Sequence, residues 1–167
     1  DRLLDSNDPF LREVGIADAK GIIKPSRQDK YKQVEEFLRL LSPTLIAAIE
    51  AGQIHKPTVE NPLRITDLGC GHAYLTFAAH QFLMKSGIPV LVTGIDVRPD
   101  SRDRNNAIAQ KLGIKVYENK VPLQSLAIAD EIFLTNSATG IQWVVGYRGK
   151  RYFSRVARLI YDELQKK

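Results

Sequence analysis

The sequence predicts a three-layer α/β fold built on a doubly wound, mostly parallel sheet. Short apolar runs typical of buried strands alternate with longer stretches of helical period between residues 63 and 136. A glycine-rich turn joins the first of these strands to the helix that follows it. Strands that alternate with helices form parallel sheets covered by helices on both faces. The 167 residues, 44% of them apolar, suit one domain, residues 1–167, with a sizeable core.

Residues 1–62 are expected to form an N-terminal helical part. A short helix and an irregular lead-in come first, and Ser26 is a candidate N-cap for a longer amphipathic helix. A break is expected at Ser42–Pro43, because serine caps helices and proline favours the first helical position. Residues 44–51 then form a second helix, and residues 53–62 form a connecting loop. Two helices are therefore expected between the lead-in and the sheet.

The remaining residues are expected to form the sheet, its helices and a C-terminal β-hairpin. The expected strands are residues 63–68, 90–95, 115–118 and 131–135, and the helices between them are residues 73–85, 102–112 and 123–129. The hairpin pairs residues 141–145 with residues 150–153 through a turn at residues 146–149, and gives the sheet an antiparallel edge. Apolar residues at helical spacing between Val156 and Leu164 mark a closing helix over one face of the sheet.

The turn after the first strand is the best candidate for a functional site, and it reads Asp67-Leu-Gly-Cys-Gly-His-Ala73. Gly69 and Gly71 let the backbone turn tightly and approach a ligand. The second strand ends on Asp96, where a carboxylate can accept both hydroxyls of a ribose at the ends of neighbouring parallel strands. The pattern therefore favours a nucleoside cofactor, and an ordinary glycine-containing connection is the alternative.

This turn resembles motif I of the class I S-adenosylmethionine (SAM) methyltransferases, which have a Rossmann-like fold. Their pattern is acid-x-Gly-x-Gly-x-Gly, and here alanine replaces the third glycine. The resemblance implies that the glycines pass the methionyl part of SAM, that Asp67 holds the loop and that Asp96 binds the ribose. Glu118 could by its position contact the adenine amino group. The candidate cofactor-binding residues are Asp67, Gly69, Cys70, Gly71, Ala73, Asp96, Val97 and Glu118. No catalytic residue stands out.

The two parts of the chain resemble different protein families. Up to residue 113, it resembles a cytosolic family of SAM methyltransferases through residues 24–38, 67–77 and 101–107. From about residue 107 onward, it resembles the class IV pyridoxal-phosphate (PLP) enzymes, the branched-chain aminotransferase and aminodeoxychorismate lyase group. That likeness is carried by residues 112–118, 129–137 and 140–145. Both families have a helix ending in a sequence like Lys-Leu-Gly-Ile before a strand, which makes residues 107–114 a natural junction.

We therefore interpret the chain as an engineered chimera, with a natural methyltransferase as the alternative. Its cofactor-binding half would be residues 63–113, and its PLP-enzyme-like half would be residues 114–167. The PLP family holds its Schiff-base lysine upstream of the matching segment, so neither PLP binding nor transamination or lyase activity is expected. The leading function is a SAM-binding scaffold without an intact catalytic site. Whether it is an enzyme stays open, and an active SAM-dependent methyltransferase is the alternative.

Composition and charge limit the classes of partner that the chain is expected to bind. The net charge of +5 is concentrated in residues 98–167, which carry 13 basic and 7 acidic groups. Basic groups close in sequence to Trp143 and Tyr152 make a nucleic-acid-binding module a second alternative, although a solvated basic face is favoured. No apolar run approaches the roughly 20 residues of a membrane span, and no signal-peptide core is present, so no membrane partner is expected.

The sequence shows no metal-ligand pattern. Cys70 is the single cysteine, which excludes an internal disulfide and a cysteine-based zinc site and favours a reducing, cytoplasmic setting. His55 on the connecting loop is expected to be a surface residue rather than a ligand, with no partner His or Cys nearby, and His80 is expected to be exposed on its helix. A small-molecule cofactor is therefore the expected ligand, and no metal is expected.

Overall fold

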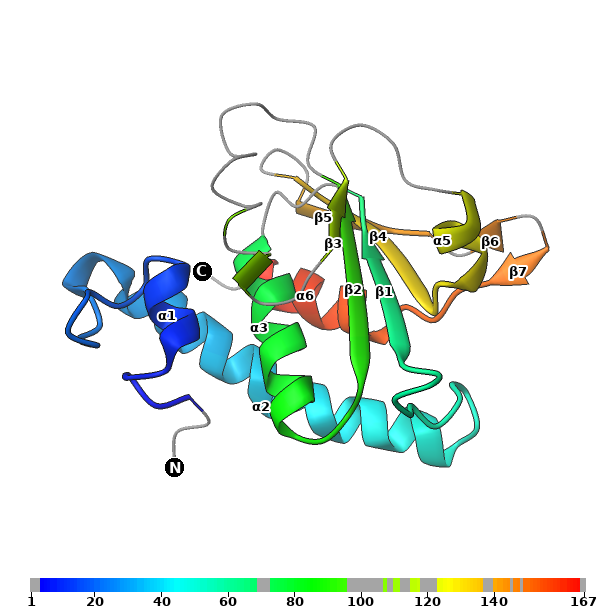
Figure 1. The fold of residues 1–167 in the computed structure, drawn as a ribbon, viewed down its shortest axis with the longest axis horizontal. Coiled ribbons are helices and arrows are strands. Elements are labelled where there is room, and N and C mark those ends of the chain that lie inside the picture. The colour runs from blue at the N-terminus through cyan, green and yellow to red at the C-terminus, as the bar shows by residue number, and fades with distance from the viewer. Residues whose placement is uncertain are drawn as a thin grey trace.

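A five-stranded sheet lies at the centre of the molecule (Figure 1). A computed structural model describes residues 4–68, 73–95, 107, 110–111, 115–117, 123–136, 140–144, 146–147 and 149–165. The strands of the sheet are β1 (Leu63–Asp67), β2 (Val90–Ile95), β3 (Lys115–Tyr117), β4 (Glu131–Asn136) and β5 (Gly140–Trp143). They lie in the order β3-β2-β1-β4-β5, in which β1 to β4 are parallel and β5 is antiparallel to β4. The predicted α/β sheet and its antiparallel edge are confirmed.

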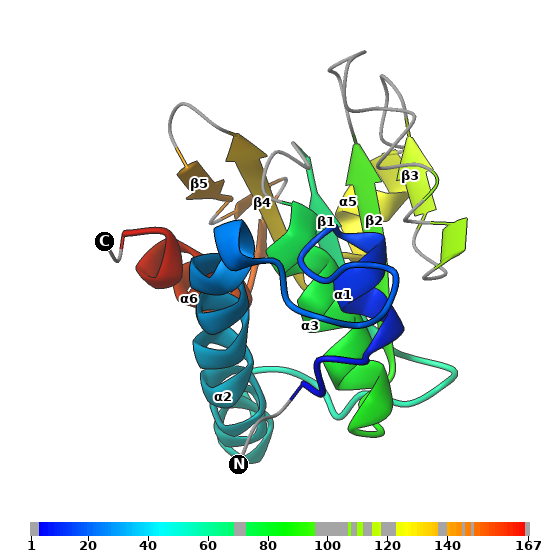
Figure 2. The same ribbon diagram turned by 90° about the vertical axis from the view of Figure 1, so that its left-hand side faces the viewer.

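Helices cover the sheet in two layers. The helices are α1 (Pro9–Glu13), α2 (Gln28–Glu50), α3 (Ala73–Lys85), α5 (Leu123–Ile128) and α6 (Arg155–Gln165), and a 3₁₀ turn, η1 (Pro25–Arg27), precedes α2. Figure 2 shows α1, α2, α3 and α6 grouped together, with α6 beside α2. In Figure 1, α5 lies away from this group, next to a small two-stranded sheet of β6 (Gly146–Tyr147) and β7 (Lys150–Arg151).

Strand β4 is buried on both faces. Phe133 is part of the large core, which joins residues of α2, α3, β1 and α6. Ile132 packs in a smaller cluster with Ala129 and Tyr152. Because neighbouring strand residues point to opposite faces, this alternation places one core on each side of the sheet. Strands buried on both sides are typical of parallel sheets, and this burial explains the apolar run of residues 132–134 in β4.

The strands on either side of residues 107–114 belong to the same sheet. Strand β3, which follows this segment, pairs with β2 through Gly94 and Val116. Strand β4 also follows it and pairs with β1 through Ile65 and Glu131. The described segments before and after the expected junction therefore share one sheet.

Glu131, the first residue of β4, is a fully buried carboxyl group at the start of α6. The backbone N–H groups of Val156 and Ala157 donate to its two side-chain oxygens, each at 3.1 Å. The first N–H groups of a helix have no partner within the helix, so this side chain satisfies two of them. Burial raises the pKa of Glu131 to about 8, against the opposing effect of these two hydrogen bonds. Glu131 thus anchors α6 to the sheet.

The prediction of two separate helices before the sheet was wrong. One continuous helix, α2, runs through Pro43, which lies inside it. Proline removes one helical hydrogen bond, yet Leu41, Leu45 and Ala48 continue the buried face across it. Packing of that face outweighs the local preference for a break. Ser26 does not cap α2, because it lies within η1, and Arg27 is the N-cap residue.

The expected pairing of residues 141–145 with residues 150–153 was also wrong. Strand β5 pairs with β4 instead, with Trp143 opposite Phe133 and Gln142 opposite Leu134. A hairpin does form around the predicted turn, but it consists of the two-residue strands β6 and β7. Its following residue, Tyr152, donates a hydrogen bond from its hydroxyl to the Leu126 carbonyl at 2.7 Å. The hairpin therefore packs with α5 rather than extending the central sheet.

Candidate functional site

The parallel strands end together at one edge of the sheet. Asp67 at the end of β1 is level with Gly94 in β2, and Ile95 is level with Tyr117 at the end of β3. The described strands β2 and β3 thus stop one residue before Asp96 and one residue before Glu118 in the sequence. Strand β1 has β2 on one side and β4 on the other, and this change of direction marks the usual ligand site of an open α/β sheet.

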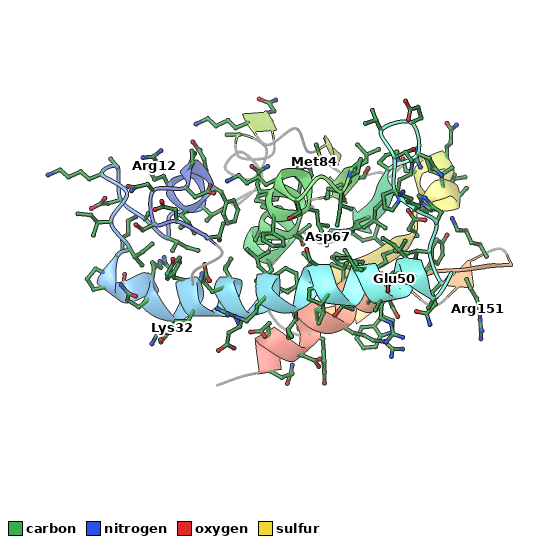
Figure 3. All side chains as sticks on the ribbon, turned by 90° about the horizontal axis from the view of Figure 1, so that it is seen from below. Arg12, Lys32, Glu50, Asp67, Met84 and Arg151 are labelled. Atoms are coloured by element: carbon green, nitrogen blue, oxygen red, sulfur yellow. The ribbon has the colours of Figure 1, made fainter. Side chains whose placement is uncertain are left out.

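Asp67 is fully buried at this edge (Figure 3). The hydroxyl of Thr76, in the first turn of α3, donates to Asp67 Oδ2 at 3.1 Å. Thr76 is itself 3% exposed, so the hydrogen bond forms away from water. A buried carboxyl group is costly unless donors satisfy it, and Thr76 supplies one of them. The bond connects the end of β1 with the start of α3 across the glycine-containing turn.

The structure describes the two sides of the predicted cofactor turn. Strand β1 ends at Asp67, one residue before the predicted end, and α3 begins at Ala73, as predicted. The other expected contacts lie outside the described residues: Gly69, Cys70, Gly71, Asp96, Val97 and Glu118. The sequence analysis did not single out Thr76. A hydroxyl residue nine positions after the motif acid, in the first turn of the next helix, is the pattern that could have identified it.

His55 and Asp130 form a pair at the opposite end of the strands. His55 Nε2 lies 3.2 Å from Asp130 Oδ2, and the backbone N–H of Arg64 donates to the same oxygen at 2.7 Å. Asp130 immediately precedes β4, and Arg64 is the second residue of β1. The sequence did not indicate Asp130 as a partner of His55, because the two residues are 75 positions apart. The pair holds the connecting loop against the starts of β1 and β4. This is the opposite end of the strands from the edge where Asp67 lies.

His80 is buried rather than exposed, which corrects an expectation from the sequence. Only 6% of its surface is accessible, and burial lowers the pKa of its imidazole. It lies one helical turn after Thr76, on the same side of α3, and this helix is buried over most of its circumference. The prediction placed His80 at an exposed position of this helix, but α2 and β2 both pack against α3. His80 is therefore a core residue.

Among the described residues, there is neither a candidate metal site nor a candidate membrane-spanning helix. These residues bring together no group of three or more His, Cys, Asp or Glu side chains that could hold a metal ion. Within the same residues, no helix has the length and apolar character needed to cross a membrane.

Comparison with known protein families matches residues 29–146 to a family described as methyltransferase domain. The match includes α2, the cofactor turn and all five strands of the central sheet. The chain belongs to the methyltransferase domain family. Its match runs without interruption across residues 107–114 and on through β5. A search of curated proteins found no match.

These findings give no support to the interpretation of the chain as a chimera. A single methyltransferase domain covers both sides of the expected junction, and no comparison supports a class IV PLP-enzyme part. The likeness of residues 129–137 to PLP enzymes falls mostly on β4, the strand paired with β1 in the sheet. Short apolar strand sequences of this kind are common, because many buried parallel strands have a similar apolar composition. The PLP resemblance is therefore best explained by shared strand composition.

Proposed function

We propose that this methyltransferase domain binds SAM at the carboxyl edge of β1 and β2 and transfers its methyl group to an acceptor. The observation that carries the proposal is the buried acid Asp67, bonded to Thr76 at the turn between β1 and α3, in a chain of this family. The sheet order supports it, because ligands of such sheets bind where the strand order reverses. SAM supplies an electrophilic methyl group on a sulfonium centre.

Each predicted cofactor-binding residue has a proposed role. Asp67 holds the turn, and Gly69, Cys70, Gly71 and Ala73 allow its backbone to approach the methionyl part. Asp96, next to Val97, accepts hydrogen bonds from the ribose hydroxyls. Glu118 contacts the adenine amino group. These roles need no metal ion and no phosphate-binding lysine, in keeping with the chemistry of SAM.

The aromatic residues near the C-terminal basic groups favour a cofactor site over a nucleic-acid module. The guanidinium of Arg158 lies 5.5 Å from the ring centre of Trp143, and Lys150 Nζ lies 5.3 Å from that of Tyr152. Trp143 also contacts Tyr161 edge to face, with ring centres 5.9 Å apart. Rings that already pair with the chain's own cations and aromatics are less open to stacking with bases. We therefore do not assign nucleic-acid binding.

Calorimetric titration with S-adenosylhomocysteine, the product form of the cofactor, tests the proposal. We expect saturable binding with one site per chain. PLP is the matched control ligand, and we expect no binding heat and no imine absorption with it. A second measurement, release of methyl groups from labelled SAM in the presence of candidate acceptors, separates an active enzyme from a scaffold that only binds. The absence of binding heat with S-adenosylhomocysteine would contradict the proposed function.

A further inference from the structure

The hydrogen bond between Thr76 and Asp67 joins β1 directly to α3. Its partners are nine residues apart, one at the end of a strand and the other in the first turn of the following helix. Asp67 is fully buried, and Thr76 is 3% exposed. The bond therefore holds the end of β1 and the start of α3 together.

The direction of the Thr76 hydroxyl is informative. A threonine within a helix commonly donates to the backbone carbonyl one turn earlier in its own helix. Here the hydroxyl donates to a side-chain oxygen of Asp67 in the preceding strand, at 3.1 Å. A buried site strengthens such a hydrogen bond. Loss of this donor would leave a fully buried carboxyl group short of one partner.

We propose that Thr76 is a positioning residue for the cofactor, which acts by holding Asp67, at the end of β1, against the start of α3. The inference rests on the proposed function, since it assigns a further residue to the same site. Thr76 does not touch the cofactor. It fixes the acid and the start of α3 relative to each other, so these two sides of the site are already in place when the cofactor binds.

Three substitutions test the role of Thr76. Thr76→Val keeps the shape of the side chain and removes the donor, and we expect it to weaken the binding of S-adenosylhomocysteine about tenfold. Thr76→Ser keeps the donor and should bind within about twofold of the wild type. Thr93→Val is the matched control, because Thr93 lies on β2 and is 7% exposed. It removes another buried hydroxyl of the same kind and should leave the affinity unchanged.

Binding is measured by calorimetry well below the unfolding temperature, with near-ultraviolet circular dichroism as the check on folding. Unchanged affinity in Thr76→Val, with a wild type that binds, would overturn the inference and leave the proposed function standing. Equal losses in Thr76→Val, Thr76→Ser and Thr93→Val would also overturn it, because they would indicate a general effect on packing.

Hydrogen exchange without ligand tests the role of Thr76 independently of cofactor binding. We expect Thr76→Val, but neither Thr76→Ser nor Thr93→Val, to speed amide exchange in the peptide of residues 68–76. If the wild type does not bind S-adenosylhomocysteine, the proposed function fails, and this exchange measurement alone decides whether Thr76 holds Asp67 against the start of α3. Unchanged exchange in Thr76→Val would then overturn the inference.

Discussion

The stability of the wild-type chain relative to its Glu131→Gln variant is expected to fall by about 1.4 kcal/mol per pH unit between about pH 5 and pH 8. Burial raises the pKa of Glu131 from its ordinary value of 4.5 to about 8, so the folded chain holds a proton that the unfolded chain releases. A raised pKa in the folded state gives stability that is fully present below about pH 4.5. This stability is lost as the pH rises through about 8. The total change is roughly 4 kcal/mol over three pH units.

The Glu131→Gln variant is the control because glutamine does not titrate at this position. Subtracting its free energy of unfolding at each pH removes the contributions of groups common to both chains. These include the buried His80, whose lowered pKa acts with the opposite sign. Urea denaturation followed by circular dichroism and tryptophan fluorescence supplies the measurement. A difference that is flat or rises between pH 5 and pH 8 would contradict a protonated Glu131.

The same denaturation curves test our proposal that residues 1–167 form one domain. The large core includes Leu11 near one end of the chain and Ile160 near the other. Glu131 connects β4 with α6. We therefore expect one transition at every pH, with coincident curves from both probes. Two transitions, or a stably folded N-terminal fragment after cleavage near residue 113, would contradict the single-domain proposal.

Asp96→Ala is expected to weaken the binding of S-adenosylhomocysteine by about ten- to a hundredfold. The proposed ribose contact is a hydrogen bond to a charged group, which contributes about 1.5 to 3 kcal/mol. Calorimetric titration of the two chains measures the change. Because the substitution lies beyond the end of β2, we expect the unfolding transition to shift little.

Asp162→Ala is the matched control for Asp96→Ala, since Asp162 is an exposed acid on α6. It removes the same charge from the chain and should leave the affinity unchanged. Equal affinity in the wild type and Asp96→Ala would place the ligand away from the end of β2. A loss of the same size in Asp162→Ala would show that net charge, rather than the ribose contact, controls binding.

The parallel part of the fold could be predicted because its local and long-range requirements agree. The apolar, β-branched residues of Val90–Ile95 favour a strand, and burial on both faces of a parallel sheet requires such a sequence. The turn before α3 combines glycines with the start of a helical period, so the boundary at Ala73 was also predicted.

The errors arose where packing overrides local sequence. Pro43 is a typical break in an isolated helix, but the buried residues on either side of it keep α2 continuous. The partner of β5 depends on its contact with β4, and the nearby turn of residues 146–149 suggested a different pairing. The predicted exposure of His80 was wrong for the same reason, and the Asp130 partner of His55 was not anticipated. Their surroundings are supplied by distant segments, which a single element's sequence does not reveal.

At the site, the motif identified the acid and the turn but not the donor that satisfies the acid. Asp67 was predicted from its place at the end of a strand, before the glycines. The contribution of Thr76 became visible only when α3 was placed against β1. The chimera hypothesis is not supported. Short strand sequences are shared by unrelated folds, whereas the family match covers residues 29–146 as a whole.

A crystal structure of the chain grown with S-adenosylhomocysteine tests the central claim most directly. We expect one molecule at the carboxyl edge of the sheet, with its ribose hydroxyls on the Asp96 carboxylate and its amino-acid part beside the turn after Asp67. A hollow also lies along α2, lined by residues that include Gln28, Tyr31 and Arg39. Ligand density in that hollow, with none at the ends of β1 and β2, would contradict the proposed cofactor site.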